Sequence, residues 1–193
     1  MWMKHSIRER VEQVFKNTHF DPNQNLREKT DDEKKVLNII FELEEHMEQD
    51  TLSLENELFA TEALGDLYRV INKPDESIHY HSENLRLISE DENKQVPAFI
   101  RLGVSYIYAD ELKKALLCFE KAETIINRNN IDEYTDLLEY QRGKCYLEMR
   151  YYNWAKDAFE SALNISSRKN NPELIGITRE ALEYCNEKLN AQV

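Results

Sequence analysis

Apolar residues recur at helical spacing in the first fifty residues and predict two helices there. Residues 3–16 and residues 34–48 each place their apolar side chains on one face of a helix. These positions are Ile7, Val11, Val14 and Phe15 in the first segment, and Val36, Leu37, Ile40, Leu43 and Met47 in the second. Between them, residues 18–29 are polar and contain Pro22, which predicts a loop.

The starts of several helices carry residues that typically cap them. Thr30 and Glu33 have the spacing of a capping box, in which Thr caps the helix and Glu reaches back. Asp50 or Thr51 is expected to cap the helix that follows. Later helix starts are marked by Pro74, and by Asn171 as a cap with Pro172 at the first helical position.

A short motif recurs four times in the rest of the chain: a small residue with Tyr three positions later. The four copies are Gly65 with Tyr68, Gly103 with Tyr106, Gly143 with Tyr146, and Ala181 with Tyr184. Successive small residues are 38, 40 and 38 positions apart. A fixed period of this length indicates a repeat architecture.

A second set of residues follows each glycine at offsets of 12, 16 and 19. These residues are Ser77, His81 and Asn84, then Ala115, Phe119 and Ala122, then Ala155, Phe159 and Ala162. The offsets place them on one face of a second helix. We predict that each glycine lets the two helices of a pair approach closely, and that the ring at offset 16 packs at the crossing.

The two motifs together resemble the tetratricopeptide repeat family over about residues 56–190. The repeats here are 38–40 residues long, whereas the family usually has 34, and the surplus falls between pairs, at 89–96, 127–134 and 166–173. Such lengthened repeats are similar to those of kinesin-light-chain-type proteins and of the Rap-type bacterial peptide-sensing regulators. The resemblance implies an all-α fold, an α-α superhelix.

The expected architecture is three helix pairs, a C-terminal capping helix and the N-terminal helical extension. We expect two units, an extension over residues 1–50 and a repeat domain over residues 51–193. Within the repeat domain, the pairs are expected at about 52–90, 95–128 and 132–166, and the polar capping helix at 172–190.

Composition narrows the classes of partner. The 193 residues carry a formal net charge of −12 without a basic stripe, so neither nucleic acid nor an anionic membrane surface is an expected partner. The start has no apolar run typical of a signal peptide, and three widely spaced cysteines, Cys118, Cys145 and Cys185, indicate free buried thiols. We therefore expect a cytoplasmic protein, and its oligomeric state stays open.

Motifs for chemistry are absent from the sequence. Only four glycines occur, so a Gly-rich phosphate loop is not possible, and no HExxH, CxxC or GxSxG motif is present. The close pair His79 and His81 would point to different faces of a helix, which makes a poor metal site. We expect neither an enzyme nor a cofactor, although an enzyme with an unrecognised site is one alternative.

The family resemblance also implies a binding groove on the concave face, lined by the first helix of each pair. The implied groove residues are Glu62, Asp66, Arg69, Ile100, Val104, Ile107, Tyr108, Tyr140, Lys144 and Leu147, with Phe59, Val70, Pro97, Leu137 and Glu148 beside them. Family members that clamp a terminal carboxylate use Lys and Asn where Glu62 and Asp66 stand here, and these acids would repel such a ligand.

The middle of this groove is apolar and aromatic, which favours an apolar or amphipathic peptide or helix as ligand. An alternative is that the N-terminal helices of the chain fill the groove. The main functional hypothesis is a non-enzymatic scaffold that binds a protein or peptide. The second is a regulatory protein related to the Rap-type regulators, acting through its N-terminal helices.

Overall fold

The computed structural model describes residues 5–48, 52–88 and 90–191, which form nine α-helices and one short β-hairpin. The first part contains α1 (His5–Lys16), β1 (His19–Asp21), a 3-10 turn (Pro22–Gln24), β2 (Arg27–Lys29) and α2 (Glu33–Met47). The rest contains α3 (Leu54–Val70), α4 (Pro74–Leu87), α5 (Glu92–Tyr108), α6 (Leu112–Asn129), α7 (Thr135–Glu148), α8 (Tyr152–Lys169) and α9 (Pro172–Asn190).

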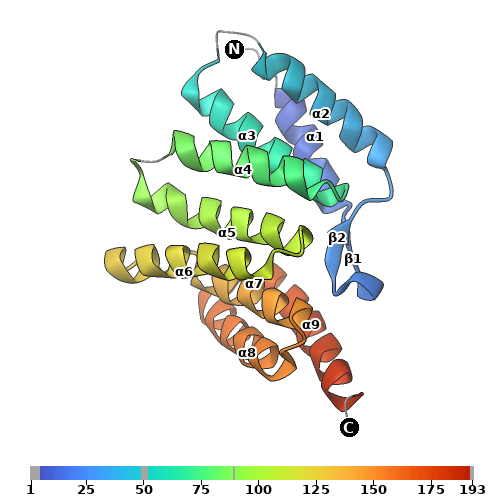
Figure 1. The fold of residues 1–193 in the computed structure, drawn as a ribbon, viewed down its shortest axis with the longest axis vertical. Coiled ribbons are helices and arrows are strands. Elements are labelled where there is room, and N and C mark those ends of the chain that lie inside the picture. The colour runs from blue at the N-terminus through green and yellow to red at the C-terminus, as the bar shows by residue number, and fades with distance from the viewer. Residues whose placement is uncertain (1–4, 49–51, 89, 192–193) are drawn as a thin grey trace.

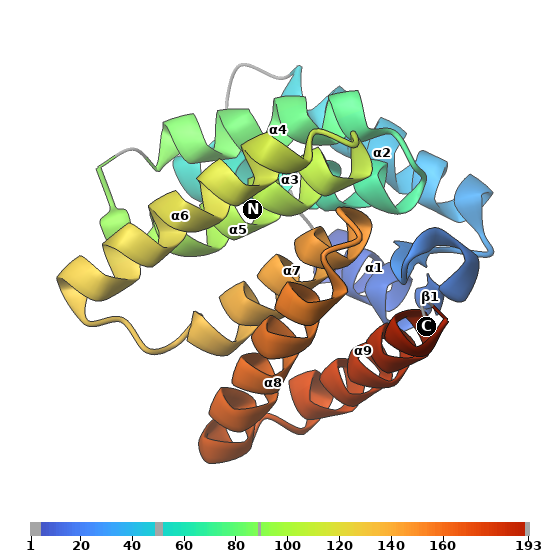
Figure 2. The ribbon, with the colours of Figure 1, turned by 60° about the horizontal axis from the view of Figure 1, so that its bottom comes forward.

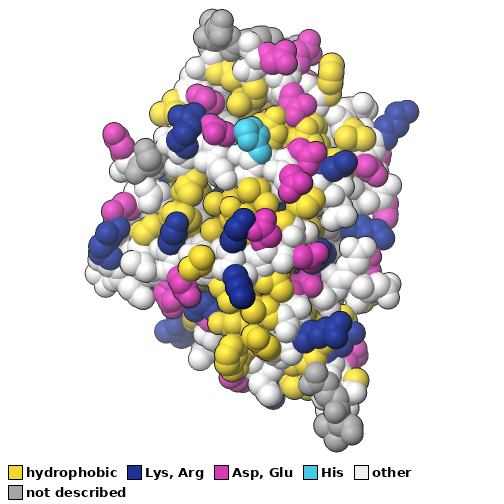
Figure 3. All heavy atoms as spheres, in the orientation of Figure 1, with side chains coloured by type: hydrophobic (Ala, Val, Ile, Leu, Met, Phe, Trp, Pro, Cys, Tyr) yellow, Lys and Arg dark blue, Asp and Glu magenta, His cyan; other side chains and the backbone are white. Residues whose placement is uncertain are grey.

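Three antiparallel helix pairs, α3/α4, α5/α6 and α7/α8, stack one after another, and α9 closes the stack (Figure 1). Helices α3, α5, α7 and α9 contact one another in succession and form the inner layer, while α4, α6 and α8 form the outer layer (Figure 2). This confirms the all-α superhelix of three pairs with a closing helix and a helical extension. The surface seen in Figure 3 mixes acidic and basic side chains.

Each repeat glycine lies where the two helices of a pair cross. A Cβ atom added at Gly65 would come within 2.5 Å of the His81 ring, and one added at Gly143 within 2.6 Å of the Phe159 ring. At Gly103 the same atom would overlap the Phe119 ring. The glycine at each crossing and the ring sixteen residues later therefore touch, which confirms the predicted register.

The N-terminal helices pack on the first repeat. Residues of α1, α2 and α3 form one hydrophobic cluster: Ile7, Val11, Val14, Val36, Ile39, Ile40, Leu43, Ala60, Ala63, Leu64 and Leu67. Phe41 and Leu37 of α2 point away from this cluster and are 69% and 45% exposed. The shared core joins the extension to the repeats, and the boundary at residue 50 stays a prediction.

Two predicted helix starts are confirmed and one is wrong. Pro74 begins α4, and Asn171 caps α9 by accepting a hydrogen bond from the Leu174 amide, with Pro172 at the first position. For α2, however, the cap is Asp32, which accepts from the Lys35 amide at 3.0 Å, and not Thr30. Asp50 and Thr51 lie outside the described residues, and Ser53 caps α3.

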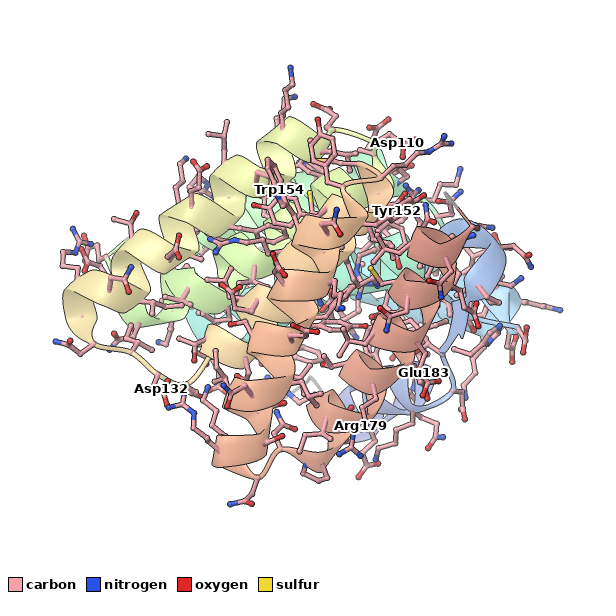
Figure 4. The ribbon with its side chains drawn as sticks, turned by 90° about the horizontal axis from the view of Figure 1, so that it is seen from below. Asp110, Asp132, Tyr152, Trp154, Arg179 and Glu183 are labelled. Carbon is pink, nitrogen blue, oxygen red and sulfur yellow. The ribbon has the colours of Figure 1, made fainter. Side chains whose placement is uncertain are left out.

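The sequence suggested that the extra length of the repeats lies in the connections between pairs. In the structure it lies largely in longer helices. Helix α5 already begins at Glu92, while α6 runs to Asn129 and α8 to Lys169. Asn130 and Asn170 then end these two helices in the left-handed conformation, which Asn tolerates better than most residues. The closing helix α9 presents Arg179 and Glu183 outward (Figure 4), as expected of a polar cap.

The segment 18–29, predicted as a loop, is instead a β-hairpin. Its strands pair antiparallel with Phe20 opposite Glu28 and Asp21 opposite Arg27. The Asp21 side chain accepts from the Asn23 amide at 2.9 Å, which holds the 3-10 turn. Asn25 and Leu26 complete the reversal with φ values of 50° and 61°.

Candidate functional site

The predicted groove residues come together on the inner layer, but most of them are buried. The seven from α5 and α7 are each no more than 7% exposed: Ile100, Val104, Ile107, Tyr108, Tyr140, Lys144 and Leu147. Arg69 of α3 is equally buried, whereas Glu62 keeps 43% of its side chain exposed and pairs with Arg101 at 2.8 Å. Their role in binding stays a prediction.

The hairpin covers Tyr108, Tyr140 and Leu147, whereas Ile100 and Ile107 are buried between the helices of the second repeat. The hairpin lies within the first fifty residues, of which the alternative hypothesis had expected the helices to fill the groove. Leu26, at its tip, is 8% exposed and belongs to the hydrophobic cluster of the third repeat, with Tyr140 and Leu147. Phe20 packs at the edge of the same cluster. In Figure 2 the hairpin lies beside α1 and α9.

Arg27 anchors the hairpin to the C-terminal end of α5. Its Nε donates to Glu148 Oε1 at 2.6 Å, and its Nη2 donates to Asp110 Oδ1 at 2.6 Å. Nη2 also lies 3.2 Å from the carbonyl oxygen of Ile107, where the helix dipole is negative. Although burial opposes the charge, the bonds to Glu148 and Asp110 raise the pKa of Arg27.

Glu28 is held from both its backbone and its side chain. Its amide donates to Tyr108 Oη at 2.5 Å, and its carboxylate forms an ion pair with Arg69. Arg69 also contacts Asp66, at 3.3 Å, on its own helix. Burial would raise the pKa of Glu28, but the positive charges of Arg69 and Lys144 lower it below its ordinary value.

Lys144 is an unusual member of this cluster because its ammonium group is buried against aromatic rings. Within the described part of the chain, no carboxylate lies within 4.0 Å of its ammonium group, which instead faces the Phe20 ring at 5.0 Å and the Tyr140 ring at 5.9 Å. Burial lowers the pKa of Lys144 to about 8. The Tyr140 hydroxyl is also buried without a hydrogen-bond partner among the described residues.

The inner face is not wholly covered. A cavity of about 560 Å³ opens between α1, the hairpin and α9, lined by Phe15, Lys16, Thr18, His19, Phe20, Glu28, Arg69, Glu173 and Ile177. A smaller cavity of about 280 Å³ lies over α3 and α5, where Phe59, Glu62, Pro97 and Arg101 meet Arg8 of α1. The first cavity leaves apolar and charged side chains accessible beside the hairpin, and the second does so between α1, α3 and α5.

Among the described residues, no group of three or more His, Cys, Asp or Glu side chains is placed to hold a metal ion. The three thiols are buried, as predicted, and burial raises the pKa of Cys118 to about 11 and of Cys145 to about 12. Within the same part of the chain, none of the helices is long and apolar enough to cross a membrane.

The sequence reasoning missed the residues of the hairpin that organise the site: Leu26, Arg27 and Glu28. The sequence does contain a signal for the hairpin, the run of turn-forming residues from Pro22 to Asn25. Such a run between two short segments is compatible with a hairpin. Three-residue strands are too short to show the alternation by which strands are recognised.

Comparisons with known proteins find likeness only at the level of structure. No family model matches the chain, and no curated protein matches it. The apo form of RapI superposes with a TM-score of 0.65 at 19% identity, covering 83% of this chain and 59% of that one. This chain therefore spans less than two thirds of the RapI chain.

Two further structures share the same architecture. PlcR of Bacillus thuringiensis, in complex with the peptide PapR7 and DNA, has a TM-score of 0.64 at 18% identity, covering 92% of this chain and 68% of that one. TPR-like repeats of a putative kinesin light chain from Podosopora anserina have a TM-score of 0.62 at 15% identity, covering 98% and 90%. The chain thus has the fold of the tetratricopeptide-like repeat proteins.

Proposed function

We propose that this chain is a non-enzymatic repeat module that binds a protein or peptide on the inner face of its stack. The observation that carries the proposal is the cavity of about 560 Å³ between α1, the hairpin and α9. Its walls combine the half-buried apolar side chains of Phe15, Phe20 and Ile177 with the charged Lys16 and Glu173. Such a mixture suits an amphipathic peptide.

The structural neighbours support this proposal at the level of fold. PlcR, which has the same architecture, has been crystallised with a peptide. Of the predicted groove residues, Arg69 lines this cavity, whereas Glu62 lines the smaller cavity over α3 and α5. Glu62 and Asp66 both pair with Arg101. The expected absence of nucleic-acid partners and the cytoplasmic location stay predictions.

A selection from a random-peptide library tests the proposal. We expect peptides enriched on the full chain to bind Ile177→Asp at least about tenfold more weakly, because the substitution places a charge in an apolar wall. The matched control is Leu117→Asp, which makes the same type of change at a side chain that is 55% exposed on the outer layer. If the enriched peptides bound the two variants and the parent equally, the peptide-binding site would lie outside this cavity.

The second candidate is a regulatory protein of the Rap type, acting through its N-terminal helices. The observation that favours it is the exposure of Phe41 and Leu37 on α2, at the end of the stack opposite α9. A partner bound there would lose affinity for Phe41→Asp and keep its affinity for Ile177→Asp. The two variants therefore separate the two candidate surfaces in one binding assay.

A further inference from the structure

We infer that the hairpin, residues 19–29, is a displaceable internal occupant of the groove, and that the site beneath it takes a peptide with an apolar residue in a turn, followed by arginine and glutamate in extended conformation. The inference rests on the proposed function and names the chemistry of its ligand. Three consecutive side chains of the hairpin, Leu26, Arg27 and Glu28, reach the groove floor, and Asn25 and Phe20 add contacts with Glu148 and Lys144.

Each of these three side chains meets a receiving site on the inner layer. Leu26 enters an apolar slot beside Tyr140 and Leu147. Arg27 meets the two carboxylates of Glu148 and Asp110. The order of the three sites along the groove defines the order of residues that an external chain would need.

The charges of the groove are opposite to those of the arginine and glutamate in the proposed peptide. Three groups of negative character surround the arginine: the two carboxylates and the carbonyl end of α5. The glutamate faces Arg69, and Lys144 adds a second positive charge nearby. A peptide with the two charges exchanged would meet like charge at both places.

Tyr108 adds recognition of the peptide backbone. Its hydroxyl accepts from the Glu28 amide at 2.5 Å and lies 3.3 Å from the Glu28 carbonyl oxygen. Both contacts are to main-chain atoms, so any extended residue at this position could make them. The site therefore reads an extended backbone as well as two charges.

Several features make the hairpin displaceable. A two-stranded hairpin with three residues in each strand is marginally stable without a surface to pack on. Leu26 is held at φ 61°, a conformation that costs energy for a residue with a branched side chain and that leaving the groove would relieve. The cavity next to Phe20 and Glu28 gives an incoming peptide a first place of contact.

The test uses a fluorescent synthetic peptide with the sequence of residues 18–30 and measures its binding to the full chain by anisotropy. The double variant Leu26→Gly/Arg27→Ala removes two anchors of the internal hairpin and should leave the groove open. We expect this variant to bind the peptide at least about tenfold more tightly than the parent, because the parent groove is already occupied. The control variant Arg128→Ala removes an exposed arginine that pairs with Glu92 on the outer part of the molecule, and it should behave like the parent.

A second peptide, with Ala in place of the arginine, should bind the double variant about tenfold more weakly than the first. Hydrogen exchange of the hairpin amides reports whether the internal hairpin has left the groove. If the hairpin amides of the double variant exchanged rapidly but the peptide did not bind, the inference would be overturned. Hairpin amides that stayed protected from exchange in the double variant would also overturn it. A double variant that fails to fold would make the hairpin part of the core and would also overturn it.

The outcomes also separate this inference from the proposed function. Library peptides that bind the parent and the double variant equally, and still depend on Ile177, would support the proposed function and contradict displacement of the hairpin. If no library peptide depended on Ile177 but the hairpin peptide bound the double variant tightly, displacement of the hairpin would be supported and the proposed function contradicted.

Discussion

Replacing Gly143 with Ala should destabilise the protein, although the same change at Gly176 should stabilise it. Both residues lie within helices, α7 and α9, where Ala is favoured over Gly by about 0.8–1 kcal/mol. At Gly176 an added Cβ atom would have nothing within 4 Å. At Gly143 it would lie 2.6 Å from two carbons of the Phe159 ring.

The Phe159 ring has little freedom to move away. It is fully buried, and its centroid lies 5.8 Å from that of Tyr140 in the cluster that also contains Leu26. Overpacking of a dense core typically costs about 1–3 kcal/mol. After the gain in helix propensity, Gly143→Ala should lose up to about 2 kcal/mol, while Gly176→Ala should gain about 0.5–1 kcal/mol.

Urea denaturation followed by far-ultraviolet circular dichroism measures both free energies of unfolding. Combining Gly143→Ala with Phe159→Leu should recover part of the loss, because the smaller side chain vacates the space that the methyl group needs. The free energies of the single and double variants then give a coupling energy between the two positions. If Gly143→Ala were as stabilising as Gly176→Ala, the close helix crossing described above would be refuted.

Three further predictions follow from the packing and the buried charges. Glu44→Ala should lower the free energy of unfolding by about 1–3 kcal/mol, because the Glu44 carboxylate accepts hydrogen bonds from Tyr68 at 2.6 Å and from Tyr80 at 2.8 Å. The control Glu45→Ala, at an exposed neighbouring residue, should change the free energy of unfolding by less than about 0.5 kcal/mol. Equal losses in the two variants would contradict this prediction. Lys144→Met should be more stable than the parent at neutral pH. The folded-state pKa of Lys144 is about 8, below the ordinary 10.5, so its charge costs stability below about pH 8 and this cost disappears as the pH rises toward 10.5. The gain of Lys144→Met should therefore narrow over that window in pH-dependent unfolding experiments, and a constant gain would show that the ammonium is not perturbed. The three thiols, those of Cys118, Cys145 and Cys185, should be alkylated slowly in the folded protein and readily in denaturant. Mass spectrometry measures the extent of alkylation. Rapid alkylation of the folded protein would contradict the burial of the thiols.

The helical pairs could be predicted because their signals are local and repeated. Each pair contributes a glycine, a ring at offset 16 and small residues around it, and the close contact between Gly143 and Phe159 follows from that spacing alone. The helix ends were less predictable, since α6 and α8 extend until Asn130 and Asn170 reverse the chain. A continuing helix and a polar connection have similar composition at such places.

The amino-acid order thus specifies the stack, its register and the side chains that face inward, because helix periodicity and close crossings act over a few tens of residues. It does not show that the hairpin occupies this inner face. The contacts of Arg27 with Glu148 and of Asn25 with Tyr184 join residues 121 and 159 positions apart, and they exist only once the stack has placed α7 and α9 beside the hairpin. Short strands with polar side chains carry almost no local signal, so the burial of Leu26, Arg27 and Glu28 is a property of the folded molecule.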